Sequence, residues 1–165
     1  MILEEWRKQL KTKPLRYWSR IEIEEIIKEK NIDRTRFYEY SKNKYDKIIK
    51  NFYYSFVDYK DNSRIELSYM WLYFRKNLKK IYSEYANSDW EASLYKIKTL
   101  FTYNWNRKLF LILSDGWVYE GYIDEILSVL AETDGLIHDF YIVTPEYDKF
   151  AMYCDDGDCI SIYEK

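Results

Sequence analysis

The stretch RKLFLILSDGWVYEGY, Arg107–Tyr122, decides the fold. Its five consecutive apolar residues, Leu109–Leu113, form an unbroken run, which is typical of a strand covered on both faces. Asp115-Gly116 follows, and then a second strand-like run, Trp117–Glu120. Asp-Gly between two such runs predicts a hairpin with a tight two-residue turn, because both turn positions need φ > 0. We therefore expect Leu109–Leu113 to be a central strand of a sheet.

Downstream of this hairpin the pattern predicts one helix and three further strands. Apolar residues at helical spacing run from Ile123 to Leu130, and Gly135 suits the left-handed position after a helix. The strand-like segments are His138–Thr144, Phe150–Cys154 and Ile160–Tyr163. The C-terminal third is therefore predicted as strand, strand, helix, strand, strand, strand.

A second turn signal, Asp156-Gly157, separates the last two strands. If this turn is two residues long, Cys154 faces Cys159 and Tyr153 faces Ile160. The register of this hairpin is thus a prediction of the sequence alone.

The first 104 residues carry helical periodicity instead. Three Ser-x-x-Glu pairs, which begin at Ser19, Ser63 and Ser88, each precede a periodic run and resemble capping boxes. Asn31–Asn43 has a muddled pattern that allows only a short helix. The predicted helices are Ile2–Leu10, Ser19–Lys30, Tyr45–Phe56, Ser63–Tyr85 and Ser88–Phe101.

The length and composition limit the class of protein. At 165 residues the chain fits a single domain. Its 47% of hydrophobic residues exclude a disordered chain, and its mean hydropathy of −0.58 excludes an integral membrane protein. The opening MILEEWRKQLKTK does not resemble a signal peptide, because acids follow directly after two apolar residues. We expect a cytoplasmic protein with reduced cysteines.

Helices followed by a sheet predict an α+β fold in a single domain, 1–165. Residues 1–104 form a helical, basic half, which packs on residues 105–165, an acidic half with a mostly antiparallel sheet. Residues 1–108 hold 24 Lys and Arg against 15 Asp and Glu, whereas residues 109–165 hold 2 against 13. This polarity suggests a charged partner or a second copy of the chain, or else docking of the basic half on the acidic half.

Motifs for catalysis, cofactors and metals are missing from the sequence. Cys154 and Cys159 are candidates for zinc ligands, for a disulfide or for packing residues. His138 is the only histidine, so a tetrahedral zinc site lacks partners, and a cytoplasmic setting disfavours the disulfide. We expect two packed thiols, no catalytic residue, no metal and no cofactor.

The acidic residues of the last hairpin are the candidate binding site. Asp155, Asp156 and Asp158 form the densest acidic cluster, which either keeps the turn soluble or recognises a basic partner. The candidate neighbours are Trp117, Tyr119 and Glu120, because interfaces use aromatic anchors beside charges.

A nucleic-acid interface is the alternative binding function. Basic and aromatic residues alternate from Lys42 to Lys80, a combination that binds phosphates and stacks on bases. The aromatic residues share a helical stripe with aliphatic ones, however, and the net charge of −2 argues against this partner. A hydrolase without a recognisable motif is a further alternative.

One resemblance concerns residues 108–164. FLILSDGWVYEG, a short helix, DFYIV and a closing acidic hairpin are similar to the C-terminal part of small bacterial proteins of unknown function, some of which resemble immunity proteins that neutralise toxins. The resemblance contains no catalytic motif and implies no site. Together with the acidic C-terminal region, it leads us to expect a non-catalytic bacterial protein that acts by protein–protein interaction on a basic protein partner, for example a toxin.

Overall fold

A computed structural model describes residues 16–59, 64–67, 70–86, 89–101, 107–133 and 137–165. Within these ranges seven strands form one antiparallel sheet in the order β1-β4-β3-β5-β6-β7-β2. The elements are α2 (Arg16–Glu29), β1 (Phe37–Glu39), η1 (Lys42–Lys44), α3 (Tyr45–Phe56), η2 (Met70–Tyr73), β2 (Lys79–Tyr85), α4 (Trp90–Phe101), β3 (Leu109–Leu113), β4 (Val118–Gly121), α5 (Ile123–Ala131), β5 (Phe140–Val143), β6 (Lys149–Cys154) and β7 (Cys159–Glu164).

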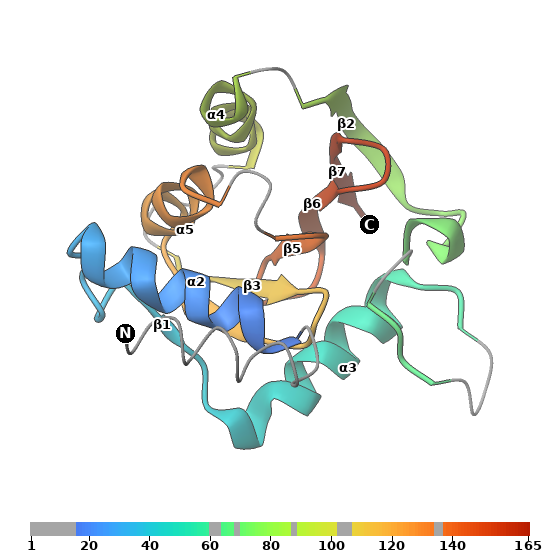
Figure 1. Ribbon diagram of the computed structural model, residues 1–165. Helices are drawn as coiled ribbons and strands as arrows, with labels where there is room; N and C mark the ends of the chain where they lie inside the picture. The colour runs from blue at the N-terminus through green and yellow to red at the C-terminus, as the bar shows by residue number, and fades with distance from the viewer. Residues whose placement is uncertain (1–15, 60–63, 68–69, 87–88, 102–106, 134–136) are drawn as a thin grey trace.

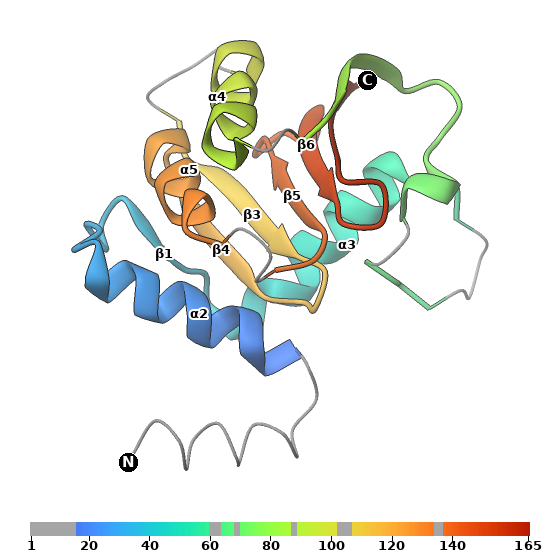
Figure 2. The same cartoon turned by 45° about the horizontal axis from the view of Figure 1, so that its top comes forward.

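Helices cover both faces of the sheet (Figures 1 and 2). Phe140 and Tyr141 are neighbours on β5, so their side chains point to opposite faces. Trp90 of α4 packs on Phe140 with ring centroids 6.3 Å apart, whereas Phe52 of α3 packs on Tyr141 at 5.1 Å. Helices α2, α4 and α5 therefore lie on one face and α3 lies on the other, which confirms the α+β class.

Strand β3 is interior, as predicted. It pairs with β4 on one side and β5 on the other, and Leu111, Ile112 and Leu113 are buried. The hairpin that follows is also confirmed, but its loop is longer than two residues. The amide of Leu113 donates to the carbonyl of Trp117, and Gly116 takes the positive φ of 97°. The left-handed residue thus closes a three-residue loop, which is the next commonest hairpin connection.

The register of the last hairpin is confirmed, because Cys154 faces Cys159 and Tyr153 faces Ile160. The amide of Asp158 donates to the carbonyl of Asp155. Asp158 rather than Gly157 has the positive φ, 44°. Asp tolerates this conformation better than most residues because its short side chain can bond locally.

Four predicted helices appear as α2, α3, α4 and α5, with different N-termini for two of them. Ser19 lies inside α2 and does not cap it, because the helix is described from Arg16. For α4 the capping side chain is Asp89, whose Oδ1 accepts a hydrogen bond from the amide of Ala92 at 3.0 Å. The predicted helix Ile2–Leu10 lies outside the described residues. The same is true of the predicted caps Ser63, Ser88 and Gly135.

The predicted long helix Ser63–Tyr85 is wrong. Where it is described, this region contains the short 3-10 helix η2 and then β2, which pairs with β7 at the edge of the sheet. The apolar residues Leu67 and Met70 are buried as predicted, although no α-helix carries them. The helical spacing of the apolar residues did not decide the structure here. Pairing with β7 stabilises a strand, and such tertiary contacts commonly override local propensity.

The N-terminal half also supplies the opposite edge of the sheet. Phe37–Glu39, in the segment predicted to allow only a short helix, forms β1 and pairs with β4. The basic half is therefore not purely helical, because it provides both edge strands. No helix within the described ranges is long and apolar enough to cross a lipid bilayer.

Candidate functional site

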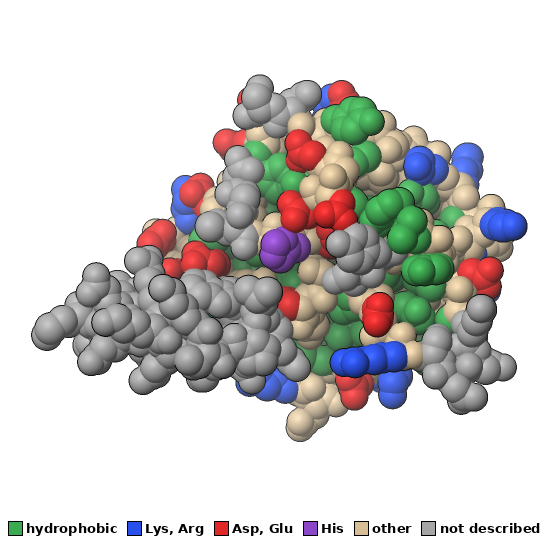
Figure 3. Space-filling view, turned by 45° about the vertical axis from the view of Figure 1, so that its right-hand side comes forward, with side chains coloured by type: hydrophobic (Ala, Val, Ile, Leu, Met, Phe, Trp, Pro, Cys, Tyr) green, Lys and Arg blue, Asp and Glu red, His purple; other side chains and the backbone are tan. Residues whose placement is uncertain are grey.

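The loop between β6 and β7 carries the predicted binding carboxylates, Asp155, Asp156 and Asp158, which we call the acidic tip. All three side chains are exposed. Figure 3 shows acidic side chains gathered beside the imidazole of the chain, with hydrophobic side chains next to them. The structure therefore brings the three aspartates together on an open surface.

The acidic tip is fixed to the start of β5. The backbone amide of Asp155 donates a hydrogen bond of 2.9 Å to Oδ1 of Asp139, whose side chain is buried. The carbonyl of Asp139 accepts from the amide of Ser114 at 3.1 Å, which ties the β3–β4 loop to the same point. Oδ2 of Asp155 lies 2.9 Å from Nδ1 of His138. Three segments distant in sequence thus converge under the tip.

The other side of the tip is held by β2 and β6. Oδ1 of Asp158 accepts a hydrogen bond from the hydroxyl of Tyr153 at 2.9 Å, and its carbonyl accepts from the amide of Ala86 at 2.7 Å. Because Asp158 also has its left-handed backbone, the orientation of its carboxylate is set before any partner arrives.

Two of the predicted neighbours, Trp117 and Tyr119, belong to the core. Their exposed fractions are 4% and 0%. The ring of Tyr119 stacks on Phe37 at 5.1 Å, and its hydroxyl donates to Glu24 of α2. Neither ring offers a surface beside the acidic tip, and the aromatic anchors of the predicted site are not part of it.

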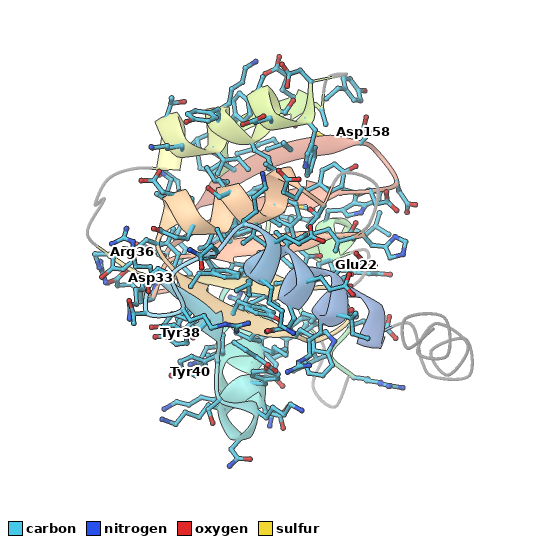
Figure 4. All side chains as sticks on the ribbon, turned by 60° about the vertical axis from the view of Figure 1, so that its left-hand side comes forward. Glu22, Asp33, Arg36, Tyr38, Tyr40 and Asp158 are labelled. Carbon is cyan, nitrogen blue, oxygen red and sulfur yellow. The ribbon has the colours of Figure 1, made fainter. Side chains whose placement is uncertain are left out.

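Glu120, the third predicted neighbour, lies on a strand distant from the tip. Strand β4 is separated from β7 by three strands, and Glu120 accepts a hydrogen bond of 2.6 Å from the hydroxyl of Tyr38 on β1. Nζ of Lys108 in turn donates to that hydroxyl at 3.2 Å. Figure 4 shows Tyr38 of β1 and the preceding Arg36 well apart from Asp158. Glu120 therefore belongs to a separate polar cluster.

A cleft of about 940 Å³ lies between α3 and the β3–β4 loop. Trp117 lines it, and the charged centres of Arg20 and Lys42 each lie 5.5 Å from the centre of its ring. The charged residues that line the cleft are Lys42, Lys50, Arg64, Asp46, Glu66 and Asp115. The lining therefore carries three basic and three acidic side chains.

A charged network beside this cleft was not predicted. Arg20 of α2 donates two hydrogen bonds to Oε2 of Glu39, at 3.0 and 2.8 Å, and Tyr45 donates to Oε1. Burial alone would raise the pKa of Glu39, but these donors hold it below its ordinary value. Burial and Glu39 raise the pKa of Tyr45. Arg20 and Glu39 are nineteen positions apart in the sequence. Local sequence patterns do not report contacts at that separation, so the ion pair could not be predicted.

The cysteines face each other at the base of the acidic tip as free thiols. Cys154 is buried, and its burial raises the pKa of its thiol. Cys159 is only partly buried, with its Sγ 3.3 Å from Oγ of Ser83 on β2. In the described residues, no three His, Cys, Asp or Glu side chains lie close enough together to hold a metal ion.

Comparison with known proteins gives one match. The model of a family described as a family of unknown function, DUF6756, matches residues 16–165. No curated protein and no solved structure matches the chain.

Proposed function

The chain belongs to the family of unknown function DUF6756, and we propose that it acts without catalysis, by binding a basic protein partner through its acidic tip. One observation carries this proposal. Within the described residues, no Lys or Arg side chain makes an ion pair with Asp155, Asp156 or Asp158. The described part of the basic half therefore forms no ion pair with the tip, and its three exposed carboxylates keep oxygens that a partner could reach.

The fixed geometry of the tip supports the same proposal. A binding site loses conformational entropy when its side chains become ordered on binding. Here Asp139 and Tyr153 already position the backbone of Asp155 and the carboxylate of Asp158. Exposed carboxylates of like sign also attract a basic partner over several ångströms, which raises the association rate at low salt.

The finer form of the proposal is a neutralising role. A bacterial immunity-type protein would place such carboxylates over the basic active site of a toxin, and so exclude its anionic substrate. The resemblance of residues 108–164 to small bacterial proteins suggested this role. The acidic tip supplies the complementary charge that it needs.

A triple substitution tests the proposal. Asp155→Asn, Asp156→Asn and Asp158→Asn together remove three charges and keep the size of each side chain. We expect the variant to fold and to lose capture of basic proteins from a bacterial lysate at low salt. Mass spectrometry would identify the proteins that wild type retains and the variant does not.

The matched control removes the same charge elsewhere. Glu29, Asp58 and Glu91 are exposed, and a Gln, Asn, Gln triple variant at these positions should capture the same proteins as wild type. If the tip variant also captures them equally well, the tip is not the binding site. If both variants lose capture equally, only the net charge matters, and the proposal of a specific site is wrong.

The nucleic-acid alternative loses part of its basis. It assumed basic aromatic helices from Lys42 to Lys80. The second predicted helix does not form, because that region contains η2 and the start of β2. On α3, Phe52, Tyr53 and Phe56 are buried and cannot stack on bases.

A further inference from the structure

A second concave site lies at the other end of β6 from the acidic tip. It is a pocket of about 430 Å³ between the C-terminal half of α3, the residues that follow η2, the β5–β6 loop and Lys165. Figure 1 shows the end of α3, the segment after η2 and the C-terminal end of β7 on the same side of the molecule. The pocket is within the size range of small-molecule sites.

Two cations line this pocket, Arg75 and Lys165. Nη2 of Arg75 donates to the carbonyl of Tyr54 at 2.8 Å, while its Nε is buried without a hydrogen-bond partner. Nζ of Lys165 lies 5.5 Å from the centre of the Phe56 ring. Neither cation makes an ion pair with a described carboxylate. Because its Nε is inaccessible, Arg75 can offer a ligand only the N–H groups of its guanidinium that do not bond Tyr54.

The carboxylates near the pocket are engaged elsewhere. Glu146 lines the pocket but forms an ion pair with Arg107. Asp148 accepts a hydrogen bond from the hydroxyl of Thr144. The Arg107 guanidinium offsets the charge of Glu146, so the residues that line the pocket keep the positive charges of Arg75 and Lys165.

Uncharged polar residues form another part of the pocket lining. Asn51, Ser55 and Asn77, which carry amide and hydroxyl side chains, also line the pocket. Tyr147 also lines the pocket, and its backbone has a positive φ of 54°. The Tyr147 ring stacks on Phe110 at 6.2 Å. A residue that is neither Gly nor Asn is unfavourable in this conformation, so the surrounding contacts hold the ring in the wall.

We propose that this pocket binds a small molecule through a carboxylate or phosphate group. A guanidinium presents donors in a planar fork that matches the oxygens of such a group, and an ammonium adds a point charge. Arg75 and Lys165 are the residues that contact the oxyanion, and the amides and hydroxyl provide further donors. The site is independent of the acidic tip.

Calorimetric titration with inorganic phosphate and with succinate tests this, at ionic strength held constant with sodium chloride. We expect saturable binding of at least one probe with one site per chain. Arg75→Gln should weaken it by roughly tenfold or more, and Lys165→Met should also weaken it. Lys76→Gln, a change of the neighbouring exposed cation, should not. Binding of one probe alone identifies the group that the pocket prefers.

The proposal is overturned if neither probe binds, or if Arg75→Gln and Lys165→Met both bind as tightly as wild type. Lys165→Met keeps the test valid if Arg75→Gln fails to fold. The triple Asn variant of the acidic tip serves as a further control. It should bind the probes like wild type, so that failure at one site is distinguished from failure at the other.

Discussion

The amide of Asp155 and the carboxylate of Asp139 are joined by a hydrogen bond of 2.9 Å, although sixteen residues separate them. Asp139 is only 9% exposed, so this acceptor works in a poorly solvated position. The acidic tip is therefore anchored to the sheet by a buried side chain that carries no part of the proposed recognition.

Asp139→Ala should loosen the tip. It leaves the amide of Asp155 without its acceptor, which costs about 1–3 kcal/mol of unfolding free energy. We expect faster hydrogen exchange at the Asp155 amide and a lower denaturation midpoint. Asp156→Ala, at the exposed turn, is the control. It should change the exchange rate of the Asp155 amide and the denaturation midpoint much less. Equal exchange rates at Asp155 in wild type and Asp139→Ala would contradict the anchoring role.

Leu111→Asp should unfold the domain. Leu111 is fully buried on the interior strand, so the substitution buries an unpaired charge and costs several kcal/mol, a large part of the stability of a typical domain. Leu72→Asp is the matched control, because Leu72 is 56% exposed. Thermal unfolding followed by circular dichroism should show loss of the transition for the first variant alone.

Gly121→Ala should weaken the pairing of β1 with β4. A Cβ at this position would lie 2.7 Å from the carbonyl oxygen of Arg36 and 3.1 Å from Cα of Phe37, and backbone atoms cannot easily move away. We expect a cost of about 1–3 kcal/mol, measured by denaturant titration. Gly157→Ala is the control, since its Cβ would meet only Cys159, at 3.8 Å. Similar midpoints for the two variants would argue against a tight β1–β4 contact.

The Glu39 network should make stability depend on acidity. In the folded protein the pKa of Glu39 is held below its ordinary value of 4.5, because donors from Arg20 and Tyr45 outweigh the effect of burial. The ionised carboxylate therefore contributes stability above about pH 4.5, and this contribution is lost as the pH falls through the folded pKa. Glu39→Gln should be less stable at neutral pH and should lose less stability on acidification.

The pH dependence of the denaturation midpoint checks this. The wild-type and Glu39→Gln curves should converge as the pH is lowered. Parallel curves throughout the acid range would mean that Glu39 has the same pKa in the folded and unfolded states.

Local patterns were sufficient for the C-terminal third of the chain. Leu109–Leu113 is interior because an unbroken apolar run is stable only when both faces of the strand are covered. The opposition of Cys154 and Cys159 followed from the position of the turn, since a hairpin sets its own register. The exposure of the acidic tip followed from the same turn.

The sheet edges and the surroundings of the site were decided only by the tertiary structure. Lys79–Tyr85 has helical spacing, yet it is a strand because β7 offers a partner more than seventy residues away in sequence. Tyr119 is buried because α2 and Phe37 cover that face of β4. Arg75 and Lys165 line one pocket because the amide of Arg75 donates to the carbonyl of Phe56 at the end of α3 and the neighbouring Phe74 packs on Tyr163 of β7. The periodicity of apolar residues indicates which residues share one face of a helix or strand. Which element then covers that face depends on contacts between distant segments, whose free energy no local pattern contains.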